Sequence, residues 1–265
     1  MNPFAKPYHI NFSRADLGTS PPAIALLSGE PERSARIARD YLQNSRQLSD
    51  YRGLNSYIGY LDSTPILVAT SGMGAPSLSI AVNELVQVGI EKIVRIGTCG
   101  SIQARVRVGD VVISTGALCR QGAANDIAPV EYPAVADPFL TVALAGAARD
   151  LGIEYHLGIT ASVDTFYEGQ ERTESSANPH LPRWLQGITE EYRRLNILNY
   201  EMEAGTLLKM AGVYSFTAAC ICGVVARRTE NEAIEVEKKG EAIERAIEVA
   251  LHAIRTLSAR EIGNT

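Results

Sequence analysis

Short apolar runs suited to buried strands alternate with segments of helical spacing along most of this chain. The runs that predict strands are residues 22–27, 57–61, 65–70, 90–96, 108–114, 155–163 and 216–225. The segments that predict helices are residues 34–41, 77–88, 140–151, 183–195, 202–210 and 233–260. This alternation predicts an α/β fold with a mixed, mostly parallel sheet covered by helices. At 265 residues the chain can bury one sizeable core, so we expect a single domain over residues 1–265.

Composition excludes several classes of function. The formal charge is −5 and the pI is near 5.5, without the basic patch that nucleic-acid binding or a membrane surface requires. No apolar segment approaches the roughly 20 residues that span a bilayer, and residues 1–11 lack an apolar signal core. We therefore expect a cytoplasmic protein with small-molecule substrates. The spacing of Cys220 and Cys222 does not fit a CxxC redox or zinc pair, so reduced thiols are expected.

The segment RIGTCG at residues 95–100 follows the apolar run 90–94 and places an arginine where a buried strand opens into glycines. Ligands of α/β sheets bind outside the carboxyl ends of strands, and glycines there let backbone N–H groups approach a phosphate. A bound phosphate and a plain tight turn with a surface arginine both fit this hexapeptide. A dinucleotide site at Gly72-x-Gly74-x-x-Ser77 fits less well, because the next strand ends in Arg95 rather than an acidic residue.

Several longer motifs occur in an order that resembles the uridine phosphorylases. They are SGEPER at 28–33, SGMGAPS at 71–77, RIGT at 95–98, APVEYPAVAD at 128–137, FYEGQER at 166–172 and NYEME at 199–203. The resemblance covers nearly the whole chain. It implies a nucleoside phosphorylase fold, a three-layer α/β/α domain around a mixed sheet. It also implies phosphorolysis of uridine, and of deoxyuridine in some members, to uracil and the pentose 1-phosphate, with inorganic phosphate as co-substrate and no organic cofactor.

The resemblance assigns phosphate to Gly29, Arg33, Arg95 and Thr98 of one subunit and to Arg52 of its neighbour. Arginine suits this task because its planar fork binds phosphate oxygens in pairs and stays charged. Shared sites of this kind imply a homodimer as the catalytic unit, and members of the family often assemble three dimers into a hexamer.

The resemblance assigns the ribose to Thr98, Met202 and Glu203. It also implies that His9 of the neighbouring subunit reaches toward the 5′-hydroxyl. A carboxylate accepts hydrogen bonds from ribose hydroxyls, and such contacts strengthen as the sugar becomes cationic. We therefore expect Glu203 to take part in catalysis together with Arg95.

The resemblance assigns the base to a third group of residues, Phe166, Gln170, Arg172 and Arg228. The amide of Gln170 complements the O2/N3 edge of uracil, and Arg172 can stabilise negative charge on the departing base. Gln170 and Arg172 complete the expected catalytic set. Residues 223–229 lack the aspartate typical of purine-specific relatives, which favours uracil.

Four positions depart from the family pattern. Gly53 replaces a glutamate that helps bind a monovalent cation between subunits, and glycine offers no side-chain oxygen, so we expect neither that cation site nor any other metal site. Glu30 replaces a common aspartate, Cys99 a common threonine, and Glu168 a proline in the base-binding loop. Residues 168–182 predict an exposed loop, and residues 229–239 predict either a mobile flap over the nucleoside or simply the start of the last helix.

Other functions remain open on the sequence alone. One is a purine nucleoside phosphorylase or a nucleosidase of the same fold. Another, from a different class, is a nucleoside-binding protein without catalytic activity.

Overall fold

The computed structural model describes residues 2, 4–229 and 236–263. The strands are β1 (Ile24–Ser28), β2 (Gln43–Ser49), β3 (Ser56–Leu61), β4 (Thr64–Thr70), β5 (Lys92–Ser101), β6 (Val111–Arg120), β7 (Ala134–Val135), β8 (Tyr155–Val163), β9 (Asn199–Glu201) and β10 (Thr217–Arg227). The α-helices are α1 (Pro31–Tyr41), α2 (Ala75–Gln87), α3 (Gly122–Asn125), α4 (Pro138–Asp150), α5 (Ile188–Arg194), α6 (Ala204–Tyr214) and α7 (Val236–Gly263). Short 3₁₀ helices cover Arg14–Leu17, Tyr51–Gly53 and Arg183–Leu185.

The strands form one mixed sheet in the order β10-β6-β8-β9-β5-β1-β4-β3-β2, with β7 added on β6. Strand β10 also pairs in parallel with β5, so β5, β10, β6, β8 and β9 close into a ring, while β1 to β4 continue as an open sheet. Strand β5 joins these two halves. It pairs with β1 only as far as Leu27 and Arg95, so its remaining residues extend past the end of β1.

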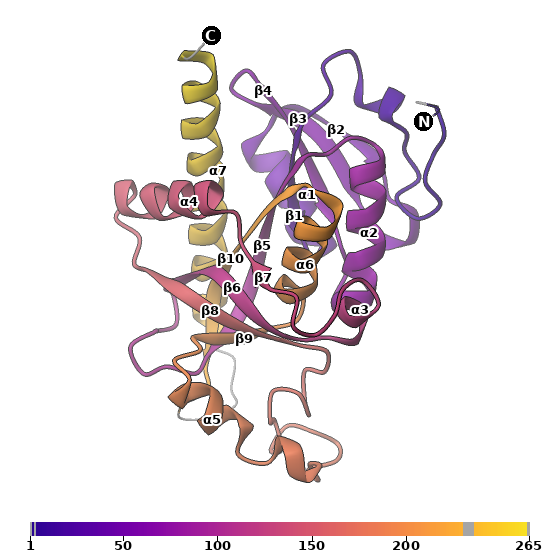
Figure 1. The fold of residues 1–265 in the computed structure, drawn as a ribbon. Helices are drawn as coiled ribbons and strands as arrows, with labels where there is room; N and C mark the ends of the chain where they lie inside the picture. Colours follow the sequence, from indigo (N-terminus) through magenta and orange to yellow (C-terminus); the bar gives the residue numbers. More distant parts are fainter. Residues whose placement is uncertain (1, 3, 230–235, 264–265) are drawn as a thin grey trace.

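Helices cover both faces of this sheet (Figure 1). On β1, Ile24 and Leu26 point into a core shared with α1, α4 and α7, whereas Ala25 and Leu27 point into a core shared with α2 and α6. Alternate side chains of one strand thus serve opposite layers, as the two-residue repeat of a strand requires. The expected α/β fold with three layers is confirmed.

The bounds of several predicted elements need correction, among them the following three. The expected end of the strand at residue 96 is wrong, because β5 continues through Gly97 and Gly100 to Ser101, paired with β10 along the whole length. The helix expected over residues 183–195 is interrupted at Gly187, whose left-handed φ of 78° separates a 3₁₀ turn from α5. The helix expected from residue 202 begins at Ala204, because β9 occupies residues 199–201.

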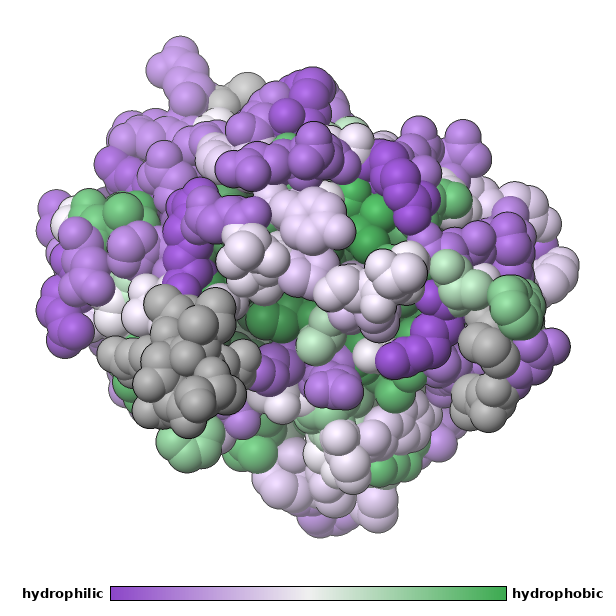
Figure 2. Space-filling view, turned by 90° about the horizontal axis from the view of Figure 1, so that it is seen from above, coloured by the Kyte–Doolittle hydropathy of each residue, from purple (hydrophilic) through white to green (hydrophobic). Residues whose placement is uncertain are grey.

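Within the described ranges, no helix is long and apolar enough to cross a membrane. The face seen from above in Figure 2 is largely hydrophilic, and hydrophobic residues appear there as separate patches.

Candidate functional site

A cavity of about 480 Å³ lies where β5 extends past the end of β1. Nine of the twelve predicted site residues line it: Gly29, Arg33, Arg95, Thr98, Phe166, Gln170, Arg172, Met202 and Glu203. They come from four separate stretches of sequence, at residues 29–33, 95–98, 166–172 and 202–203. The other three, His9, Arg52 and Arg228, are not among the residues that line the cavity.

Two buried arginines form one end of the cavity. Arg33, in the first turn of α1, donates to the Ile96 carbonyl at 3.0 Å and to the Glu30 carboxylate at 2.8 Å. Arg95, inside β5, pairs with Glu203 and lies 3.5 Å from Glu201. Arg33 Nε and Arg95 Nε and Nη1 find no hydrogen-bond partner within the described chain. Buried N–H donors left over on two neighbouring cations fit a bound anion.

The side chain of Arg95 fits because position 97 is glycine. A Cβ on Gly97 would lie 2.3 Å from Arg95 Nη1 and 2.9 Å from Cys222 Sγ. Strand β5 therefore uses this glycine for close packing, and the tight-turn interpretation of RIGTCG is wrong. Burial alone would lower the pKa of Arg95, but the carboxylate of Glu203 and other nearby groups raise it well above the ordinary value.

Two carboxylates line the cavity next to Arg95. Glu203 accepts from the backbone N–H of Gly74 at 2.6 Å and pairs with Arg95, so it links the 71–77 loop to β5. Glu201 accepts from the N–H groups of Glu203 and Ala204, both at 2.8 Å, and so caps the start of α6. Burial, opposed by Arg95, raises the pKa of Glu201 to about 7.

The other end of the cavity carries an amide, a cation and a ring. Arg172 Nε donates to Gln170 Oε1 at 3.3 Å, and its guanidinium stacks 4.1 Å from the centre of the Phe166 ring. Gln170 and Arg172 are both buried, so the expectation of an exposed loop over residues 168–182 is wrong at these two positions. Arg228 donates instead to the backbone carbonyls of Gln170 and Glu171, at 3.0 and 3.3 Å. It therefore binds the backbone of this loop, and it is not among the residues that line the cavity.

His9 and Arg52 lie together on the surface, apart from the cavity of their own chain. The His9 ring bonds Glu84 at 2.6 Å and meets the Tyr8 ring edge-on, while Arg52 donates to the Tyr8 hydroxyl at 2.9 Å. Arg52 adopts a left-handed φ of 56° beside Gly53, which is also left-handed. The two residues that the sequence assigns to a neighbouring subunit thus form one cluster.

All four cysteines are free thiols. Cys99 lines the cavity, and Cys222 lies against Cys220 with 3.7 Å between the sulfurs. Donation from the thiol of Cys220, and then from that of Cys99, lowers the pKa of Cys222 well below its ordinary value, whereas burial raises that of Cys99. Across the described ranges, no group of three or more His, Cys, Asp or Glu side chains could hold a metal ion.

Comparisons with known proteins identify the family of this chain. The family model of the Phosphorylase superfamily matches residues 23–258. The chain belongs to this superfamily. A uridine phosphorylase from Haemophilus influenzae is 40% identical over 250 residues, covering 94% of this chain and 98% of the relative. One from Escherichia coli is 37% identical, with 94% and 97% covered. A guanosine phosphorylase from Halorubrum lacusprofundi is 34% identical, with 88% and 93% covered. The family resemblance inferred from the motifs is confirmed.

Sequence reasoning missed several residues that line the cavity of this superfamily member: Met73, Tyr200, Val225, Ala226 and Lys239. Glu201 lies in the quoted NYEME motif, but the motif does not reveal that its carboxylate caps α6. Tyr200 also lines the cavity, and burial raises the pKa of its hydroxyl to about 12. Of the proposed flap, residues 230–235 lie outside the described chain, and residues 236–239 begin α7.

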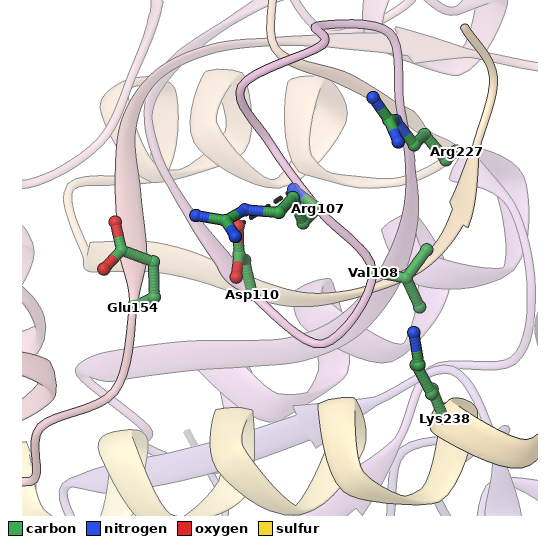
Figure 3. Close-up of a pocket in the computed structure, with 6 residues that line it drawn as sticks. All are labelled: Arg107, Val108, Asp110, Glu154, Arg227 and Lys238. Atoms are coloured by element: carbon green, nitrogen blue, oxygen red, sulfur yellow. Dashed lines mark hydrogen bonds between the residues drawn. The ribbon is translucent and has the colours of Figure 1, made fainter. Parts of the chain in front are cut away.

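A second cavity, of about 440 Å³, lies elsewhere on this phosphorylase-superfamily chain (Figure 3). Its lining residues are Arg107, Val108, Asp110, Glu154, Arg227 and Lys238. The Asp110 carboxylate accepts from the Arg107 backbone N–H and contacts His156, both at 2.9 Å. In Figure 3 the charged groups point in different directions rather than toward one centre, so they suit a structural network better than a binding site.

Proposed function

We propose that this chain is a uridine phosphorylase, which cleaves uridine or deoxyuridine with inorganic phosphate and releases uracil and the pentose 1-phosphate. One observation carries the proposal: a single cavity is lined by two arginines with unpartnered N–H donors, by a buried glutamine and arginine, and by Glu203. These are the groups that an anion, a base edge and a sugar require.

At the anion end, Arg33 and Arg95 would hold the phosphate, with Gly29 and Thr98 beside them. A phosphate oxygen then attacks C1′ of the ribose as the bond from C1′ to N1 of the base breaks. Glycosyl transfer of this kind passes through a cation-like sugar. The carboxylate of Glu203, already fixed by Gly74 and Arg95, would hold the ribose hydroxyls where that charge develops.

At the base end, the electron pair of the broken bond passes to the uracil ring and its oxygens. Gln170 offers both a donor and an acceptor for the base edge, and Arg172 offers a cation that is preorganised by Phe166. A fixed donor at the site of developing charge lowers the barrier without reorganisation. Arg172 would thus replace a general acid.

Two copies of the chain would complete each site. His9 and Arg52 lie together on the surface, and neither joins the cavity wall among the described residues. A second copy related by a twofold axis would bring its own cluster to the cavity and receive the first one in return. The active unit in this proposal is a dimer, and sedimentation analysis distinguishes it from a monomer or from a hexamer of three dimers.

The reaction as proposed needs no organic cofactor, and it needs no monovalent cation bound at Gly53. Glycine at this position has no side-chain ligand to offer. Rates measured in potassium phosphate and in tetramethylammonium phosphate should therefore agree. A strict requirement for potassium would contradict this part of the proposal.

The deciding experiment incubates the protein with uridine or inosine, with and without phosphate, and follows base release by absorbance. Phosphate-dependent release of uracil is expected. Uracil released equally well without phosphate would indicate a nucleosidase. Turnover of inosine alone would instead favour a purine enzyme, the alternative raised by the guanosine phosphorylase relative. Binding without turnover would leave a nucleoside-binding protein.

A further inference from the structure

The loop that carries Gln170 and Arg172 makes a tight turn, and Glu171 occupies its strained position. The N–H of Arg172 bonds the carbonyl of Tyr167 at 2.7 Å, and the N–H of Glu171 bonds that of Glu168 at 3.0 Å. These nested bonds follow the Schellman pattern, in which the residue before the last is left-handed. Glu171 has that conformation, with φ of 52°.

Glycine or asparagine is the usual residue at such a position, because a larger side chain is strained there. A glutamate needs a compensating contact, and the structure supplies one. The Glu171 carboxylate accepts from the backbone N–H of Gly187 at 2.5 Å and from that of Thr189 at 2.9 Å. Both N–H groups belong to the start of α5, where a helix cannot satisfy its own donors.

This contact connects the base end of the cavity to a separate layer of structure. Thr189, whose N–H the carboxylate binds, also bonds the Tyr200 hydroxyl through its own side chain at 3.0 Å, and Tyr200 lines the cavity. Arg228 also holds the carbonyls of Gln170 and Glu171. The turn is therefore fixed both by its backbone carbonyls and by the side chain of Glu171, which is not among the residues that line the cavity.

We propose that Glu171 is a positioning residue for recognition of the nucleobase, an inference that rests on the proposed function. Its carboxylate anchors the turn to α5 and so holds Gln170 and Arg172 at the distance the base requires. Glu171 itself touches no substrate. The two bonds to α5 compensate for the strain of the left-handed conformation of Glu171. They also preorganise its neighbours, Gln170 and Arg172.

The test compares Glu171→Gly with Glu171→Gln. Glycine accepts the left-handed φ without strain, so Glu171→Gly removes the carboxylate while leaving the turn its preferred backbone. We expect KM for uridine to rise about 10- to 100-fold, as small misplacements of binding groups do. KM for phosphate should stay within about twofold, because Arg33 and Arg95 lie at the other end of the cavity. Glu171→Gln keeps one acceptor oxygen and should fall between this variant and the original protein.

A matched control is Glu190→Gln, in the first turn of α5. Glu190 is exposed and pairs only with Arg193 and Arg194 among the contacts in the described chain, so its loss perturbs α5 without touching the loop. Its kinetic constants should match those of the unmodified protein. If the effect came from a general loss of α5 stability, Glu190→Gln would also raise KM for uridine and KM for phosphate. That result would overturn the positioning role of Glu171.

Amide hydrogen exchange gives a readout that does not depend on turnover. The N–H groups of Gly187 and Thr189 should exchange faster in Glu171→Gly, and unchanged exchange there would refute the anchor itself. If the original protein cleaves uridine but Glu171→Gly keeps its KM for uridine, the positioning role fails and the proposed function stands. If the original protein cleaves no uridine, the proposed function fails, whatever the exchange result.

Discussion

Replacing Gly97 with alanine tests whether activity depends on the position of the Arg95 guanidinium in the cavity. Gly97 lies inside β5 opposite Cys222 of β10, and its φ is not positive, so alanine asks for no unusual backbone. The conflict is one of space alone. The new Cβ would lie 2.3 Å from Arg95 Nη1 and 2.9 Å from both Arg95 Cζ and Cys222 Sγ.

Relieving this contact requires the guanidinium to move by about 1 Å, to an ordinary van der Waals separation. Arg95 is 4% exposed and paired with Glu203, so such a movement displaces the pair as well. A misplacement of 1 Å can cost about 100-fold in rate, equivalent to about 2.7 kcal/mol. We therefore expect kcat/KM for phosphate to fall about 100-fold, with a loss of about 1–3 kcal/mol in stability from overpacking.

The assay follows uracil release at increasing phosphate concentration, with unfolding by urea measured in parallel. Gly146→Ala in α4 is the matched control, because the nearest atom to its new Cβ is 3.9 Å away. That variant should keep its kinetics and gain up to about 1 kcal/mol in stability. If Gly97→Ala remained within twofold of the unmodified enzyme, Arg95 would not hold the phosphate as proposed.

Three further predictions follow from the site. Arg172→Ala should lower kcat/KM for uridine by about 100- to 1,000-fold while the far-ultraviolet circular dichroism stays the same, and turnover near the original rate would exclude Arg172 from base activation. Arg52→Ala and Arg95→Ala should each be inactive, yet a mixture that exchanges subunits should regain about a quarter of the activity, because hybrid dimers rebuild one intact site; no recovery would argue against shared sites. Burial raises the pKa of Glu201 from 4.5 to about 7, so the folded state binds more protons than the unfolded state in this window. The free energy of unfolding should therefore decline as pH rises from about 4.5 to about 7, and urea titrations should show a flatter profile for Glu201→Gln.

Much of the fold could be predicted because its strands carry strong apolar patterns and are joined by helices of regular spacing. The failures lie where glycine has more than one possible use. The sequence RIGTCG is consistent with a turn, but it forms part of a continuous strand in which Gly97 leaves room for the side chains of Arg95 and of Cys222 from β10. A single sequence shows that small residues are present there, and not which neighbours from β10 approach them.

The candidate site was predictable to the extent that it follows local motifs. Residues on the loops after β1 and β8 and in the NYEME motif reach the cavity as expected. Arg228 differs, because its position depends on the turn at Glu171, which no local pattern around residue 228 reveals. Val225 was missed since it belongs to an apolar run whose other members are largely buried core, and Tyr200 was missed although it lies in the NYEME motif.

The closure of β5, β10, β6, β8 and β9 into a ring also bears on self-association. Strands within a ring have partners on both sides, so in the described sheet the main unpaired edge is β2. Exposed edges recruit other chains, yet β2 has the sequence QNSRQLS, mostly exposed polar side chains, and its pairing with β3 is irregular. Arg46 on this strand further disfavours strand addition. The strands of the ring are thus paired with one another, whereas the open sheet ends in a strand that carries mostly polar residues.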